Sequence, residues 1–247
     1  MKHAVLSGAR QAFGPRFLAG VLVMAAAVLA AGFDAIHRAF QSEYLMPAGF
    51  HTQMIASALA SDTAIPFLPM AAVLPFAGTF VEDIKSKFAR FFCIRSGWMG
   101  YLSSRLIVCF LSGALAVVGG ALLAWGAAAL VLLPRQEAGA AQEGLLTQIL
   151  WLYALCGGFW AVVGMSLSTL MESKYIAYAS PFVLYYLLVI LHERYTPSLY
   201  VLDPAQWIVP QARWPFGAMG PAAVVLELTA VFAGLFIIRA ERRLKAL

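Results

Sequence analysis

Long, unbroken stretches of apolar residues dominate this sequence, and the longest are 106–133 and 145–170. Each exceeds the ~20 residues that a helix needs to cross the hydrocarbon core of a bilayer. The apolar positions follow one another without the every-second-residue alternation of a membrane barrel strand. Backbone groups in lipid must also be hydrogen-bonded within their own segment, which a helix achieves. The sequence therefore predicts an all-α membrane protein.

Composition argues against a soluble globular domain. Of the 247 residues, 62% are hydrophobic and 12% are charged, and the mean hydropathy is +0.81. A water-soluble domain of this size has too little interior to hide so much apolar surface, because its area stays large relative to its volume. Lipid is the solvent in which this composition is stable.

We expect one transmembrane domain over residues 1–247 with about six spans. They are predicted at 17–33, 63–80, 106–133, 145–170, 176–191 and 220–238. Ahead of the first span, basic and apolar residues alternate at helical spacing, which predicts a short helix at the membrane interface. Three prolines, Pro66, Pro69 and Pro75, predict kinks in the second span. The third span is longer than a bilayer requires, so we expect it to tilt or to extend beyond the membrane.

The basic residues indicate an orientation. Thirteen of the 17 Lys and Arg residues lie in the N-terminal segment, the 81–105 loop, the 171–175 turn and the C-terminal tail. Because Lys and Arg accumulate in cytoplasmic loops, we expect both termini in the cytoplasm and the chain in the inner or plasma membrane. The net charge of +5 then serves contact with anionic membrane lipid. No soluble basic face is present for a nucleic-acid partner.

The 81–105 loop carries charged and aromatic residues together. Four apolar side chains fall near one helical face, at Ile84, Phe88, Phe91 and Phe92. Such a helix rests on lipid head groups in one interpretation. In the other it docks a protein partner, because Glu82 and Asp83 add acids that anionic lipid would not favour.

This loop resembles the corresponding loop of permeases of the type-2 ABC exporter family. The pattern is an acidic pair after a span, a mid-loop basic residue, and Tyr-Leu with a basic residue at the next span. The matching residues here are Glu82, Asp83, Arg95, Tyr101, Leu102 and Arg105. The sequence departs at Lys87, where the family commonly has Gly, and at Arg105, where Lys is usual. The plan of an N-terminal helix, six spans and a long segment before the last span is also similar.

The resemblance implies that 81–105 contains a cytoplasmic coupling helix that docks into a groove of a separate ABC ATP-binding subunit. The residues expected at this contact are Glu82, Asp83, Lys87, Phe88, Arg90 and Arg95. It further implies a second permease copy, either identical or related, beside this chain. ATP and Mg²⁺ would be bound by the partner, so this chain is expected to need no cofactor. Its function would be mechanical coupling and selection of an exported substrate.

The 192–219 segment before the last span is rich in prolines and in Trp and Tyr, which favour the membrane interface. The resemblance implies an external re-entrant segment that caps the exit side of a pathway. An ordinary interfacial loop is the alternative.

Glu227 is the acid that we place well inside a span. An ionised carboxylate facing lipid is costly, so we expect it to face the bundle, to pair, or to be protonated. It is a candidate pathway residue. It also supports an alternative function, an ion-coupled secondary transporter or channel. A membrane scaffold or sensor subunit is a third class.

No catalytic motif is evident. The sequence lacks the GxxxxGK[ST] phosphate loop and the HExxH and GxSxG signatures, so we do not expect an enzyme. The three cysteines show no spacing of a metal site or a disulfide framework. Small residues four apart, at Ser112, Ala116 and Gly120, predict close packing between helices.

Overall fold

The computed structural model describes residues 2–42, 44–89, 91, 97–137, 139, 144–211 and 213–245. These residues form helices and connecting turns, with no strand among them. The α-helices are α1 Lys2–Ala12, α2 Pro15–Ala31, α3 Phe33–Gln41, α4 Phe50–Leu59, α5 Phe67–Val73, α6 Thr79–Lys85, α8 Trp98–Leu132, α9 Gly144–Met171, α10 Lys174–Ile190 and α11 Gly220–Lys245. Shorter elements are η1 Leu133–Arg135, the π-helical η2 Leu191–Tyr195, η3 Tyr200–Leu202 and η4 Gly217–Met219. The all-α prediction is confirmed.

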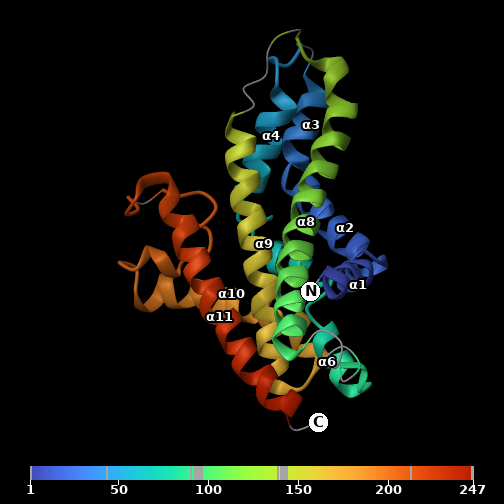
Figure 1. Cartoon of the computed structure of the whole chain (residues 1–247). Coiled ribbons are helices and arrows are strands. Elements are labelled where there is room, and N and C mark those ends of the chain that lie inside the picture. The colour runs from blue at the N-terminus through green and yellow to red at the C-terminus, as the bar shows by residue number, and fades with distance from the viewer. Residues whose placement is uncertain are drawn as a thin grey trace.

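Four single helices in the described part of the chain are long and apolar enough to cross a membrane. They contain α8, α9, α10 and α11, and the bent pair α1–α2 counts as a fifth if its two helices form one span. The protein is therefore built to be embedded in a membrane (Figure 1). The predicted second span, 63–80, does not appear as a spanning helix among the described residues.

Prolines break that predicted second span. The regular helix there consists of the seven residues of α5 and the first two residues of α6, and turns at 62–66 and 74–78 flank α5. Each proline lacks the N–H that would bond to the carbonyl four residues earlier. The breaks predicted from Pro66 and Pro75 are thus confirmed, because both lie in these turns, whereas Pro69 lies within α5. The chain from α4 through α5 to α6 nevertheless follows the bundle from one end to the other (Figure 1).

The N-terminal helix and the first span meet at a sharp bend. The helices on either side are inclined by 55° to each other. Gly14 is extended, with φ −107° and ψ −165°, and Pro15 starts α2. Proline disfavours the helical conformation in the residue before it, which explains the break.

Helix α9 is the centre of the bundle. Of the most apolar 18 residues in its span, 78% are buried, against 17% for α10 and 22% for α11. It packs against α8, α11, α10 and α5. A hydroxyl bond adds to this packing, because Ser166 Oγ donates to the carbonyl of Phe232 on α11 at 2.8 Å. The outer helices α10 and α11 leave most of their surface to lipid or to another chain.

Close approach between helices depends on small residues, as the sequence predicted. A Cβ on Gly120 of α8 would lie 2.5 Å from Met24 Cβ and 2.7 Å from the Val21 carbonyl oxygen of α2. A Cβ on Gly113 would lie 2.8 Å from the carbonyl oxygen of Gly157 on α9. The backbones of α8, α2 and α9 therefore touch where side chains are absent.

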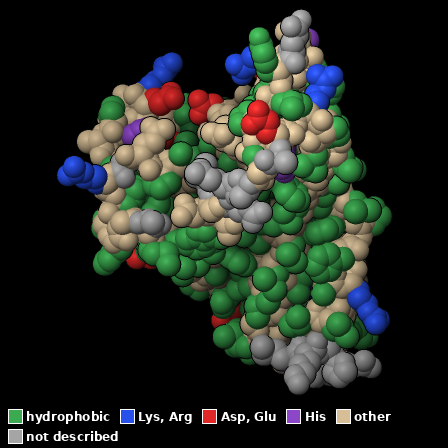
Figure 2. Space-filling model, turned by 90° about the horizontal axis from the view of Figure 1, so that it is seen from above, with side chains coloured by type: hydrophobic (Ala, Val, Ile, Leu, Met, Phe, Trp, Pro, Cys, Tyr) green, Lys and Arg blue, Asp and Glu red, His purple; other side chains and the backbone are tan. Residues whose placement is uncertain are grey.

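The helices of the bundle do not all extend equally far: the part that contains α8 is longer than the part that contains α10, α11 and the 191–219 segment. Helix α8 has 35 residues, or about 52 Å of rise, far beyond the ~30 Å of a hydrocarbon core. Together with α3, α4 and the start of α9 it projects past the 191–219 segment (Figure 1). Figure 2 views the molecule from that end and shows many hydrophobic side chains on its surface, with Lys, Arg, Asp and Glu side chains among them.

Two alanine substitutions on α8 test the packing. Gly120→Ala places a methyl group against the α2 backbone, and we expect a loss of stability of about 1–3 kcal/mol from overpacking. The matched control is Gly126→Ala, whose Cβ meets nothing within 4 Å. It should leave stability unchanged or raise it by up to about 1 kcal/mol. Denaturant unfolding in detergent micelles measures both, and equal effects would contradict the packing.

Candidate functional site

A buried ion pair joins α6 to α8. Arg105 Nη2 contacts Asp83 Oδ2, and the two side chains are only 5% and 6% exposed. The Tyr101 hydroxyl donates to the same carboxylate oxygen at 2.8 Å. Arg105 Nη1 donates to Gln11 Oε1 of α1 at 2.9 Å. One acid, one guanidinium and two polar groups therefore hold three helices together.

Helical spacing positions this cluster. Tyr101 and Arg105 are four residues apart, so both project from one face of α8 toward α6. The Arg105 guanidinium lies 5.2 Å from the ring centroids of both Phe76 and Tyr101. Burial raises the pKa of the Asp83 carboxyl, while Arg105 and the Tyr101 hydroxyl act in the opposite direction. The aromatic rings keep water away from the pair and fix its geometry.

The neighbouring acid makes a second, more exposed set of contacts. Glu82 accepts two bonds from the Arg16 guanidinium at 3.3 Å each, and its Oε1 lies 3.5 Å from Lys174 Nζ. Arg16 belongs to α2 and Lys174 to α10. Pairs exposed to this degree contribute little stability, about 0–1 kcal/mol. Their importance is geometric, since α6 is joined to two further helices.

The chain after this acidic pair turns outward. The Lys87 backbone has φ 60°, in the left-handed region that favours glycine, and this ends α6. Beyond it Phe88 and Phe91 are 49% and 68% exposed, and Lys85 and Lys87 are exposed as well. Two aromatic and two basic side chains are thus presented beside the buried cluster.

The structure separates the residues that the sequence assigned to a partner contact. Lys87, Phe88 and the half-buried Glu82 lie at the surface. Asp83 does not, because its carboxylate is used inside the chain. Arg90 and Arg95 lie outside the described residues.

Glu227 lies on the outward face of α11 and is exposed. No hydrogen bond or ion pair joins it to the described part of the chain. In a single copy it therefore neither faces the bundle nor pairs, which differs from two of the three outcomes expected for it. Its role in a pathway stays a prediction.

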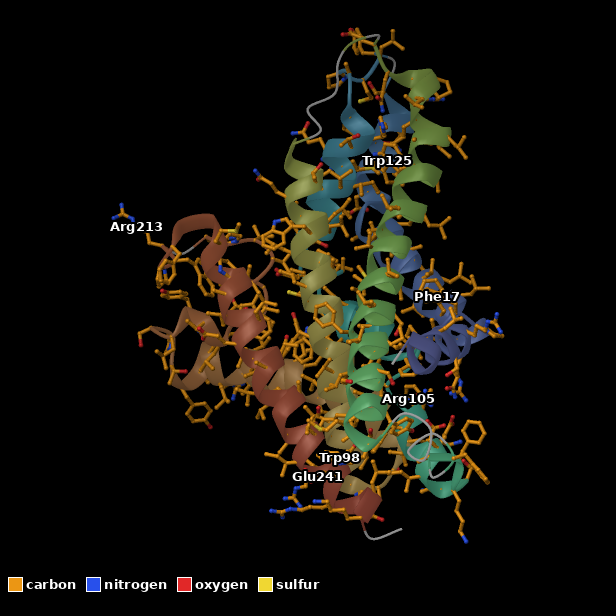
Figure 3. All side chains as sticks on the ribbon, in the orientation of Figure 1. Phe17, Trp98, Arg105, Trp125, Arg213 and Glu241 are labelled. Atoms are coloured by element: carbon orange, nitrogen blue, oxygen red, sulfur yellow. The ribbon has the colours of Figure 1, made fainter. Side chains whose placement is uncertain are left out.

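Other charges gather at the same end of the molecule as α6. Arg243 of α11 lies 2.8 Å from Glu172 in the α9–α10 turn. Lys245 Nζ lies 5.7 Å from the ring centroid of Trp98, the first residue of α8. Figure 3 shows Trp98 and Glu241 together at this end, with Arg105 further into the bundle. The start of α8 and the end of α11 thus meet within one charged layer.

The opposite end is held by a separate set of hydrogen bonds. His51 contacts Gln136 Oε1 at 3.1 Å and Thr52 Oγ1 at 3.2 Å, and the Trp125 indole donates to the same hydroxyl at 3.2 Å. Arg135 donates to the last carbonyls of α3 and lies over the Phe40 ring at 4.4 Å.

Sequence reasoning found the acidic pair but not its partners. Arg105 and Tyr101 were singled out as motif positions, and their four-residue spacing was the available sign that they share a face. Contacts from Gln11, Arg16 and Lys174 had no signal in the sequence, because they come from distant segments. Among the described residues, no group of three or more His, Cys, Asp or Glu could hold a metal ion.

Comparison with known proteins adds no assignment. No protein-family model matches this sequence, and no curated protein matches it. The functional interpretation consequently depends on the residues and contacts of this chain.

Removing one member of the buried pair tests its role. Arg105→Leu leaves the Asp83 carboxylate buried without its cation, and we expect a loss of about 3–5 kcal/mol in unfolding free energy. The double variant with Asp83→Leu should be less destabilised than Arg105→Leu, because no charge remains buried. Glu82→Gln is the control and should cost no more than about 1 kcal/mol. If the double variant lost as much stability as the sum of the Arg105→Leu and Asp83→Leu losses, a direct interaction between the two residues would be contradicted.

Proposed function

We propose that this chain is the membrane-spanning permease subunit of an ABC exporter, coupled to a separate ATP-binding subunit. The observation that carries the proposal is the way in which Glu82 and Asp83 fasten α6. Their contacts reach α2, α8 and α10 directly, and α1 through the bond from Arg105 to Gln11. The exposed Lys87, Phe88 and Phe91 follow in the chain. A partner that binds the exposed residues would act on four helices at once.

The mechanism follows from this connection. Closure of the ATP-binding subunits would push on the exposed end of α6. The Asp83–Arg105 contact is buried and cannot lengthen without leaving charges unpaired, so the push would be transmitted to α8. Helices α1, α2 and α10 would follow through their contacts with Arg105 and Glu82. The pathway would then alternate between inward and outward states, and hydrolysis would use no residue of this chain.

The backbone at Lys87 supports the same proposal. Its φ of 60° is one that glycine adopts readily and that other residues adopt rarely. Glycine is the residue common at this position in the family that the loop resembles. A lysine here retains the turn and adds a cation next to the exposed Phe88.

A second permease copy is part of the proposal, and α11 is the helix that we place at the contact. The exposed carboxyl of Glu227 is accompanied by exposed Leu226 and Val231, and residues 220–238 of α11 carry no other charge. A carboxyl that faces lipid is costly, and a covering chain lowers that cost by supplying hydrogen-bond donors.

Substitution at the exposed aromatic tests the ATPase contact. Phe91→Asp should reduce recovery of a phosphate-loop ATPase with the tagged chain from native membranes by about tenfold or more, because exposed aromatic residues dominate such interfaces. Quantitative mass spectrometry of the purified complex measures the recovery. Lys87→Glu should act in the same direction.

The matched control is Tyr44→Asp, which introduces the same charge at an 85% exposed aromatic on the opposite end. It should leave ATPase recovery unchanged. If the unmodified chain recovers no phosphate-loop ATPase, or if both aspartate variants behave alike, the proposal fails.

Disulfide crosslinking tests the contact between copies. Val231→Cys, on the face of α11 that carries Glu227, should form a covalent dimer on oxidation in native membranes. Val183→Cys, on the exposed face of α10, is the control and should remain monomeric. Gel electrophoresis without reductant measures both. A dimer formed only through position 183 would place the seam on α10 instead.

A further inference from the structure

A cavity of about 330 Å³ lies between the beginning of α9 and the segment before α11. Gln148, Ile149, Trp151 and Leu152 form the α9 wall, at the spacing of one helical face. Residues 208–210 and Met219 form the other wall. The volume is at the lower end of the range that small-molecule sites occupy.

The cavity has a buried floor and an exposed rim. Ile149, Leu152 and Ile208 are between 3% and 7% exposed and form the floor. At the rim, Trp151 is 38% exposed and Met219 is 64% exposed. A ligand can therefore enter from the surroundings of the protein and reach a dry interior.

Each wall of the cavity packs against other parts of the protein, and this packing keeps the two walls apart. One wall belongs to α9, the most buried helix of the bundle. The other is anchored by Trp207, which is 1% exposed and donates its indole N–H to the Val201 carbonyl at 2.8 Å. The Trp207 ring packs against Phe159 and Trp160 of α9 at centroid distances of 5.5 and 6.0 Å.

The uncharged, mostly apolar lining of the cavity favours a hydrocarbon group as its ligand. Its eight residues carry no charge, and their polar side-chain groups are limited to the Gln148 amide and the Trp151 indole, both at the rim. Arg213, on the same segment, points away from the bundle (Figure 3). An ion would find no counter-charge in this space. A linear chain would place methylene groups on the floor and its polar end beside Gln148.

We propose that this cavity is a binding site for a single hydrocarbon chain of an amphipathic molecule, whose polar end lies at the Gln148–Trp151 rim. The site does not depend on ATP or on transport. It is located where the segment before α11 meets the beginning of α9. The chain belongs either to a membrane lipid or to a separate single-chain amphiphile, and two probes distinguish these sources.

Photolabelling of the full chain in phosphatidylcholine vesicles tests the proposal. One probe is a phosphatidylcholine with a diazirine in its acyl chain, and the other is a diazirine-bearing palmitic acid. We expect labelling at Met219 and at 148–152 to exceed that at the exposed α10 residues Val183 and Leu187. Unlabelled palmitic acid should compete with this labelling on the unmodified protein. Labelling by both probes identifies a lipid site, and labelling by palmitic acid alone identifies a single-chain ligand.

A filling variant provides the second measurement. Val209→Trp puts an indole into the cavity and should reduce labelling at Met219 by about tenfold, because it displaces contacts of about two methylene groups. Val183→Trp on α10 is the matched control and should not change it. The proposal is overturned if cavity and α10 labelling are equal, if palmitic acid does not compete, or if the two tryptophan variants label alike.

Discussion

The contact between Asp83 and Arg105 determines the arrangement of one end of this bundle. Two opposite charges are removed from water there, and the cost of doing so is offset only while they remain together and hydrogen-bonded. Tyr101 and Gln11 complete the hydrogen bonds of the pair, so α8 and α1 take their positions relative to α6 from it. Glu82, one residue away, adds α2 and α10 through contacts that are individually weak.

Backbone packing complements this electrostatic constraint. At the middle of α8, glycines allow α2 and α9 to approach until main-chain atoms are in contact. Lipid provides no hydrophobic force between apolar helices, so such close contacts and a few interhelical hydrogen bonds supply the cohesion. Because α9 occupies the centre, α10 and α11 can pack against it and still present broad faces outward. Those faces are where a second chain or lipid must lie.

The cavity beside α9 arises because α8 and α9 are longer than the part of the bundle that contains α10, α11 and the 191–219 segment. Helices α8 and α9 rise past the 191–219 segment, which is pinned to α9 by the buried Trp207 ring. Residues 208–210, which follow Trp207, therefore lie opposite the beginning of α9 and leave a space between the two. The apolar cavity is the space between them. Its neutral lining contrasts with the charged layer at the other end, so the two ends present different chemistry to their surroundings.

The sequence by itself determined the helical class and the approximate place of the apolar helices, because long apolar runs in lipid have few alternatives. It also located the breaks at Pro66 and Pro75 and the close packing at Gly120, since both follow from local backbone chemistry. The number of spans was only partly predictable. Whether a kinked segment such as 63–80 crosses as one element depends on its neighbours.

Tertiary structure alone decided what each charged residue does. Glu82 and Asp83 are adjacent and identical in charge, yet one is half-exposed and the other is buried against Arg105. That difference arises because successive residues of a helix point in different directions, toward whichever element happens to pack there. Glu227 shows the same limit, since its position within a long apolar helix was evident from the sequence but its outward direction was not. Contacts between distant segments are set by packing, which no local pattern records.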